Sequence, residues 1–180
     1  MQSNNQMLPF RFFILLTTLF VLGRSKVVQV DLSTQGIPPT FPDTLTMQPQ
    51  DWLKITLEEN PSTGYQWVYN VAKIPISERI LTLANSEYKE SSTGQRNMLG
   101  RPGTRVFTFS VNKNIMSGQQ EVELIYARSW ELEQILLPSG EIDTKNAEKL
   151  GLEYYPVKTI VSITSPSHFS TTQFHRRGWE

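Results

Sequence analysis

Acidic side chains and histidines are the residues of this sequence that could carry out hydrolysis. Glu58 and Glu59 are adjacent, and Glu131 and Glu133 are close in sequence, so either pair could supply the two carboxylates of a glycoside hydrolase. Adjacent residues of a strand point to opposite faces, however, so neighbouring acids do not converge on one bond. We therefore expect all four to be ordinary solvated charges.

The other reactive side chains do not indicate an enzyme either. The 180-residue chain has no cysteine and two histidines, His168 and His175, which lie in the C-terminal tail outside any expected core. A general base or a nucleophile needs a partner held within hydrogen-bond reach on a rigid element. No His, Asp or Glu cluster has the spacing of metal ligands. We expect no catalytic residue, no metal and no cofactor.

Three short motifs beside runs with strand character contain most of the functional information. They are Asn60-Pro61-Ser62-Thr63-Gly64-Tyr65, Gly100-Arg101-Pro102-Gly103 and Arg128-Ser129-Trp130. Each has a plain explanation when taken singly, because Pro and Gly make competent turns and an isolated tryptophan is often a core residue. If one β scaffold places all three at the same end, they form a composite binding surface.

The segments that would position these motifs have the character of strands. Residues 52–57 alternate apolar and polar side chains, as expected of a strand with one face on a core. Strand character appears in 27–30, 44–47, 52–57, 65–69, 81–83, 106–111, 121–128 and 157–163. Short strands, turn signals and almost no helical periodicity predict an all-β, immunoglobulin-like antiparallel β-sandwich of seven to eight strands.

One long connection interrupts this pattern. Residues 131–154 have the composition of an ordinary surface excursion, although 144–150 could form a short helix closed by Gly151. Connections of this length are often functional. We expect that shortening it leaves the domain folded. The tail, 166–180, is expected to be disordered.

The N-terminal segment, 1–25, has the layout of a signal peptide. Arg11 precedes an apolar run, 12–22, and the small residues Gly23 and Ser25 suggest cleavage after Ser25. The run is short for a membrane-spanning helix, and an uncleaved anchor is the alternative. We expect a route into the secretory pathway, ending outside the cell or in a lysosome-like vesicle.

Cleavage would leave one domain, 26–165, followed by the tail. It removes two arginines and no acid, so 15 basic and 17 acidic side chains remain and the formal charge is −2. This balance gives no reason to expect a nucleic acid or membrane partner. Without cysteine, the domain must be stabilised by its core alone.

In their order and spacing, the three motifs resemble the chagasin-type inhibitors of papain-like cysteine proteases. Those proteins carry an Asn-Pro-Thr-Thr-Gly-aromatic loop, a Gly-x-x-Gly loop and an Arg-Pro-Trp loop. The flanking residues Trp67, Leu99 and Tyr126 match as well, and the resemblance covers most of 26–165. The chain departs from the pattern at Ser62, at Ser129, which replaces a proline, and in the longer connection after Trp130.

The resemblance implies a reversible inhibitor, expected to be monomeric, with papain-like cysteine proteases as its partners. Ser62, Thr63 and Gly64 would enter the catalytic cleft and block the active-site cysteine and histidine. Gly100 and Gly103 would let the second loop approach the enzyme backbone closely. The resemblance places Trp130 on an enzyme aromatic side chain and Arg128 near polar or acidic groups. The implied protease-binding residues are Asn60, Pro61, Ser62, Thr63, Gly64, Tyr65, Gly100, Arg101, Pro102, Gly103, Arg128, Ser129 and Trp130.

A secreted immunoglobulin-like adhesion or carbohydrate-binding module is the alternative. Exposed aromatic side chains such as Trp130, Tyr155 and Trp179 could stack on sugars. That function gives no reason for the three motifs to occur together. Inhibition of papain separates the two hypotheses.

Overall fold

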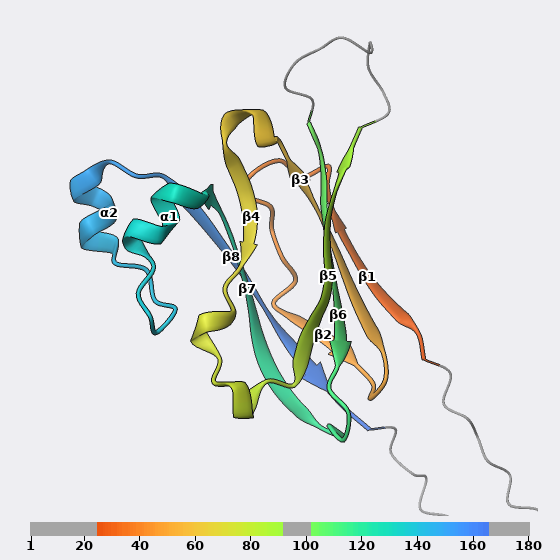
Figure 1. Cartoon of the computed structure of the whole chain (residues 1–180). Helices are drawn as coiled ribbons and strands as arrows, with labels where there is room; N and C mark the ends of the chain where they lie inside the picture. The colour runs from red at the N-terminus through yellow and green to blue at the C-terminus, as the bar shows by residue number, and fades with distance from the viewer. Residues whose placement is uncertain (1–24, 92–101, 166–180) are drawn as a thin grey trace, which may run out of the picture.

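The computed structural model describes residues 25–91 and 102–165, which contain eight strands in two sheets of four (Figure 1). The strands are β1 (Val27–Leu32), β2 (Thr44–Met47), β3 (Trp52–Glu59), β4 (Tyr65–Tyr69), β5 (Leu81–Glu90), β6 (Gly103–Val111), β7 (Gly118–Arg128) and β8 (Tyr154–Ile163). The expected all-β immunoglobulin-like sandwich is confirmed. The predicted signal peptide, apart from Ser25, and the predicted tail lie outside the described residues.

The sandwich is not wholly antiparallel. One sheet has the order β1-β3-β6-β5 and the other β2-β8-β7-β4, with β1 parallel to β3 and β2 parallel to β8. The chain crosses to the other sheet for β2 and then returns, so β1 and β3 can run in the same direction. The remaining neighbours are antiparallel.

The main core lies between the two sheets and follows the alternation of the strands. In β3, Leu53, Ile55 and Leu57 are fully buried, whereas the residues between them are only partly covered. Phe109 from β6 and Val161 from β8 close the same core. Burial of apolar side chains at every second residue is what favours the strand conformation in these segments.

Strand β7 breaks this alternation, because all six residues from Val122 to Ala127 are buried. Its second face is covered by the long connection, which contains the helices α1 (Ser129–Ile135) and α2 (Thr144–Leu150) (Figure 1). These helices and the outer face of β7 form a second apolar cluster: Ile125, Ala127, Leu132, Ile135 and Ala147. The expectation of an ordinary surface excursion is therefore wrong, and the connection is a third layer.

The sequence predicted helix α2 but not helix α1. Helix α2 agrees with the prediction: Asp143 accepts a hydrogen bond from the Asn146 backbone N–H at 3.0 Å, and Gly151 ends the helix with φ of 66°. Helix α1 was not expected. Its seven residues are stabilised by burying Leu132 and Ile135 rather than by length.

Two contacts fasten segments that lie far apart in sequence. The Asn70 side chain donates hydrogen bonds to Glu123 and to the Gly140 carbonyl, which attaches the turn between α1 and α2 to the sandwich. The buried Asp51 carboxylate accepts from the backbone nitrogen of Lys26 at 3.0 Å, and from that of Gln48 at 2.9 Å. The second contact fixes the start of β1 beside the start of β3.

No helix within residues 25–91 and 102–165 is long and apolar enough to cross a membrane.

Candidate functional site

The first motif forms a compact turn that joins the two sheets. It begins after β3, passes through a 3-10 turn, η1 (Pro61–Thr63), and ends at β4 in the opposite sheet. Asn60 Oδ1 accepts hydrogen bonds from the Ser62 backbone N–H and hydroxyl, at 3.3 and 2.6 Å. The Thr63 hydroxyl donates to the Asn60 carbonyl at 2.8 Å. The exposed tip is thus ordered by its own hydrogen bonds.

The strand registers show that the first and third motifs, together with Gly103 of the second, lie at one end of the sandwich. Across β3 and β6, Glu59 lies opposite Gly103, and across β4 and β7, Tyr65 lies opposite Arg128. The η1 turn therefore has the start of β6 on one side and the end of β7 on the other (Figure 1). Gly100 and Arg101 lie outside the described residues, and Pro102 is exposed just before β6.

Gly103 packs closely against the neighbouring strand β5. It is buried in β6, and an added Cβ would meet the Lys89 carbonyl oxygen and lie 2.5 Å from the Tyr88 hydroxyl oxygen. The missing side chain thus allows close packing against β5. Gly103 thus shapes the base of the second motif, and its contact with the enzyme backbone stays a prediction.

The third motif is a strand end and a helix start rather than a loop. Arg128 is the last residue of β7, and Ser129 and Trp130 open α1. Trp130 is 55% exposed, so it is not a core residue. Its ring lies against Gly64, where an added Cβ would be 2.5 Å from Trp130 Cη2. Because Gly64 has φ of 81° as well, only glycine suits this position.

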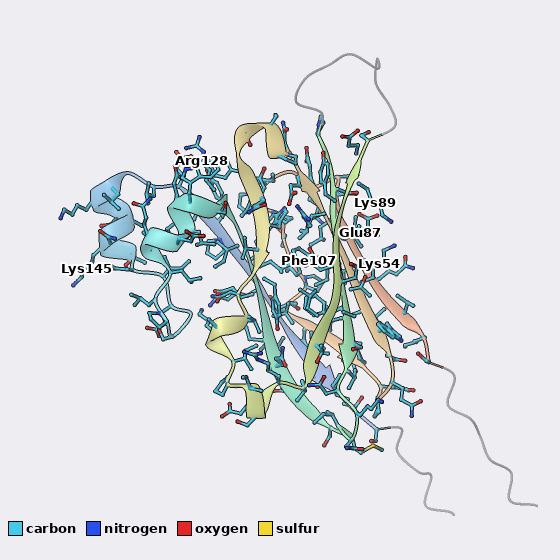
Figure 2. The ribbon with its side chains drawn as sticks, viewed as in Figure 1. Lys54, Glu87, Lys89, Phe107, Arg128 and Lys145 are labelled. Carbon is cyan, nitrogen blue, oxygen red and sulfur yellow. The ribbon has the colours of Figure 1, made fainter. Side chains whose placement is uncertain are left out.

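Arg128 is bound within the protein. Its guanidinium lies 4.7 Å from the centre of the Tyr65 ring, and its Nε–H donates to the Thr63 carbonyl at 3.4 Å. Nη1 contacts Glu131 Oε1 at 2.9 Å, and that hydrogen bond raises the pKa of Arg128. Figure 2 shows Arg128 next to the start of α1, across the sandwich from Lys89.

Tyr65 rests on a second aromatic side chain beneath the turn. Its ring stacks on Tyr126 at a centroid distance of 5.3 Å, and the Tyr126 hydroxyl accepts from the Asn60 backbone N–H at 3.5 Å. Desolvation raises the pKa of both phenols above their ordinary value, which is already well above physiological pH. The turn therefore has an uncharged aromatic base.

Glu59 is a structural residue that the sequence reasoning missed. It is fully buried and accepts from Arg105 Nη2 at 2.6 Å, from Arg105 Nε at 3.0 Å and from the Trp67 backbone N–H at 2.8 Å. One carboxylate thus joins β3, β6 and β4 directly behind the turn. The expectation of a solvated charge is wrong for Glu59. Glu58, on the opposite face, is partly exposed.

A signal for this pair was present in the sequence. Glu59 continues the period-two series of Leu53, Ile55 and Leu57, which places it on the core side of β3. A buried carboxylate needs a cation, and Arg105 lies opposite Leu57, two pairs away from Glu59 and therefore on the same face.

The remaining candidate chemical groups form no metal site in the described parts of the chain. Within residues 25–91 and 102–165, no group of three or more His, Asp or Glu side chains could hold a metal ion. Glu131 is paired with Arg128, whereas Glu133 is exposed. His168 and His175 lie outside the described residues.

Comparison with solved structures finds proteins of low sequence identity. A crystal structure of the cysteine protease inhibitor EhICP2 from Entamoeba histolytica has a TM-score of 0.45 and 20% identity, covering 78% of this chain and 98% of that one. The solution structure of amebosin has a TM-score of 0.41 and 17% identity, covering 80% and 100%. PbICP-C, solved in complex with falcipain-2, has a TM-score of 0.34 and 15% identity, covering 81% and 96%. No curated protein matches the chain.

A family model gives the assignment. The model of the chagasin family peptidase inhibitor I42 matches residues 46–141, which is just over half of the 180 residues and includes all three motifs. The resemblance seen in the motifs is thereby confirmed. The chain belongs to the chagasin family of peptidase inhibitors, and it is an inhibitor rather than an enzyme.

Proposed function

We propose that this protein is a reversible inhibitor of papain-like cysteine proteases that blocks the active-site cleft with the edge formed by its three motifs. The observation that carries the proposal is the convergence, in a member of this family, of the η1 turn, the start of β6 and Trp130 at one end of the sandwich. The carbohydrate-binding alternative does not account for that convergence.

The η1 turn is the part suited to enter a cleft. Pro61, Ser62 and Thr63 are exposed at its tip, and their local hydrogen bonds fix the backbone before any partner binds. A turn that is already ordered loses little conformational entropy on docking, so binding can be tight without covalent chemistry.

Trp130 supplies the apolar contact beside the turn. More than half of its surface is exposed, although one part of the ring rests on Gly64. A large aromatic side chain that becomes desolvated in an interface often dominates the binding energy. Gly100, Arg101 and Pro102 remain proposed contacts on the other side of the turn.

Inhibition kinetics with papain test this function. We expect competition with small peptide substrates, full recovery of activity on dilution, and little effect on trypsin, whose cleft has a different shape. Papain activity that stays undiminished at micromolar concentrations of folded protein would refute the proposal. Far-ultraviolet circular dichroism of the same sample confirms that the protein is folded.

A further inference from the structure

Two side chains of the third motif turn back onto the first motif. Arg128 covers the Tyr65 ring and contacts the Thr63 carbonyl, while the Trp130 ring lies on Gly64. Both come from the junction of β7 and α1, so this junction contacts the side of the η1 turn. The shape of the turn therefore depends on where the junction places Arg128 and Trp130.

The partner that fixes Arg128 comes from the helix. Glu131 is three residues later, in the first turn of α1, and its side chain is only 15% exposed. It accepts a hydrogen bond from Arg128 Nη1 at 2.9 Å, while the guanidinium carbon lies 4.7 Å from the centre of the Tyr65 ring. A second acid, Glu153, contacts the Tyr65 hydroxyl at 3.4 Å and adds negative potential at the same place.

We propose that Glu131 is a positioning residue for inhibition, because it holds Arg128 against Tyr65 and Thr63 and so fixes the η1 turn before the protease binds. In this arrangement Arg128 acts inside the inhibitor and is not the contact to acidic groups of the enzyme that the resemblance implies. The inference rests on the proposed function for its effect on inhibition, but not for its effect on the turn.

The helix also accounts for the departure at Ser129. The resemblance expects a proline there, which would stiffen a loop. In this chain the same position begins α1, and the Arg128–Glu131 pair connects the strand end to the helix. Helical hydrogen bonds and an ion pair thus make this segment rigid in place of the proline. The helix dipole also favours an acid in the first helical turn.

The two possible roles of Arg128 predict opposite effects of Glu131→Gln. If Glu131 positions Arg128, the substitution lets the guanidinium leave the turn and weakens inhibition. If Arg128 instead contacts an acidic group of the protease, the substitution frees it for that contact, and inhibition stays equal or becomes tighter. The sign of the change therefore separates the roles.

The experiment compares Glu131→Gln with Glu133→Gln by measuring the inhibition constant for papain at several salt concentrations. Glu133→Gln is the matched control, because it removes the same charge from an exposed position of the same helix. We expect Glu131→Gln to inhibit about fivefold more weakly than the control, the upper range for a partly exposed ion pair. Equal inhibition constants for the two variants, or tighter inhibition by Glu131→Gln, would overturn the inference.

Arg128→Lys gives a second comparison. Lysine keeps the charge but has no planar guanidinium to lie on Tyr65 and no Nε–H for the Thr63 carbonyl. We expect this variant to lose inhibition as Glu131→Gln does. The variant that carries both substitutions should inhibit papain no more weakly than the weaker-inhibiting of the two single variants. Retained inhibition with Arg128→Lys would show that only the charge matters, which contradicts positioning.

Amide hydrogen exchange tests the turn without any protease. The Thr63 and Gly64 amides donate to the Asn60 and Pro61 carbonyls at 3.2 and 2.9 Å. We expect both to exchange several-fold faster in Glu131→Gln than in Glu133→Gln; unchanged exchange would contradict the positioning role. Lack of papain inhibition by the unmodified protein would instead refute the proposed function, so the two failures are distinguishable.

Discussion

Trp130 is the residue whose substitution should separate binding from stability. Its ring is 55% exposed and contacts the η1 turn at Gly64. We predict that Trp130→Ala weakens papain inhibition by about 2 kcal/mol or more, the scale of an interface hot spot, with only a small change in melting temperature. Inhibition constants and thermal melts on the same samples measure both.

Two other tryptophans are controls for that substitution. Trp52 is 39% exposed at the opposite end of β3, so Trp52→Ala should leave inhibition unchanged. Trp67 is buried in the core, and Trp67→Ala should cost about 3–5 kcal/mol of folding stability. If Trp130→Ala behaves like Trp67→Ala, the tryptophan is structural and the binding edge is wrongly placed.

Gly64 gives an independent test of the same contact. A side chain there meets the Trp130 ring and must adopt φ of 81°. We predict that Gly64→Ala displaces Trp130 and lowers inhibition at least tenfold, whereas folding stability falls by only about 1–2 kcal/mol, the cost of one strained turn residue. Papain inhibition and urea unfolding measure the two effects.

Gly151→Ala is the matched control for Gly64→Ala. Gly151 has φ of 66°, but an added Cβ there meets nothing within 4 Å. Gly151→Ala thus has a similar cost in backbone strain but creates no clash with another side chain. Should both variants lose inhibition equally, backbone strain rather than displacement of Trp130 would be the cause.

The sequence revealed residue types better than residue partners. The turn residues Pro61 and Gly64 were predictable, because a turn dictates its residues locally. The contact between Gly64 and Trp130, the packing of Gly103 and the pair of Arg128 with Glu131 were not. The first two depend on segments distant in sequence meeting in space, which a linear pattern of residues does not specify. The pair of Arg128 with Glu131 depends on α1, a helix that the sequence did not predict.

At the scale of elements, Glu59 connects three strands behind the turn. Replacing one partner of a buried ion pair leaves the other without compensation, so Glu59→Ala should cost about 3–5 kcal/mol of folding stability. Urea unfolding measures this cost. Glu58→Ala, which removes the neighbouring acid from the opposite face, should change stability by less than about 0.5 kcal/mol. Equal effects of the two substitutions would contradict the buried role of Glu59.

The long connection should behave as a packed layer. Ile135, the last residue of α1, is 2% exposed, and we predict that Ile135→Ala lowers folding stability by about 2–5 kcal/mol. Leu137, just after the helix, is 42% exposed, and Leu137→Ala should have little effect. Chemical unfolding of both variants checks this. If the two are equally stable, the connection is dispensable, as its composition first suggested.

Strand positions were predictable where alternation was clear, and two expected strands, 44–47 and 65–69, have the observed bounds. Other strands extend further, because pairing with a neighbour stabilises polar end residues that show no apolar pattern. Helix α1 was missed for a related reason. It is short, and burial against β7 rather than helix propensity stabilises it.

At the scale of the whole molecule, the number of strands and the sandwich followed from the sequence, whereas the third layer did not. The apolar run of β7 contained a signal, since a strand buried on both faces loses its alternation. The apolar run of β7 would fit any buried strand, however. The residues around it did not indicate which segment of the chain covers its second face.

We propose, from the N-terminal sequence, that the protein enters the secretory pathway and is cleaved after Ser25. The expected start of the mature chain is Lys26, and N-terminal sequencing of protein from the native cell measures it. The first described strand begins one residue later, at Val27, so cleavage there would leave the fold complete. A cytosolic protein that still begins at Met1 would contradict the proposal.

Cleavage at that position would change the chemistry of the contact between Lys26 and Asp51. The Lys26 nitrogen, 3.0 Å from the buried carboxylate, is an amide in the precursor and would become an ammonium in the mature protein. Maturation would thus create an ion pair that the precursor lacks. We expect a chain beginning at Lys26 to melt at a higher temperature with a free than with an acetylated amine, and Asp51→Asn to abolish that difference. The new end of the chain would thus add an ion pair to a fold that is already formed.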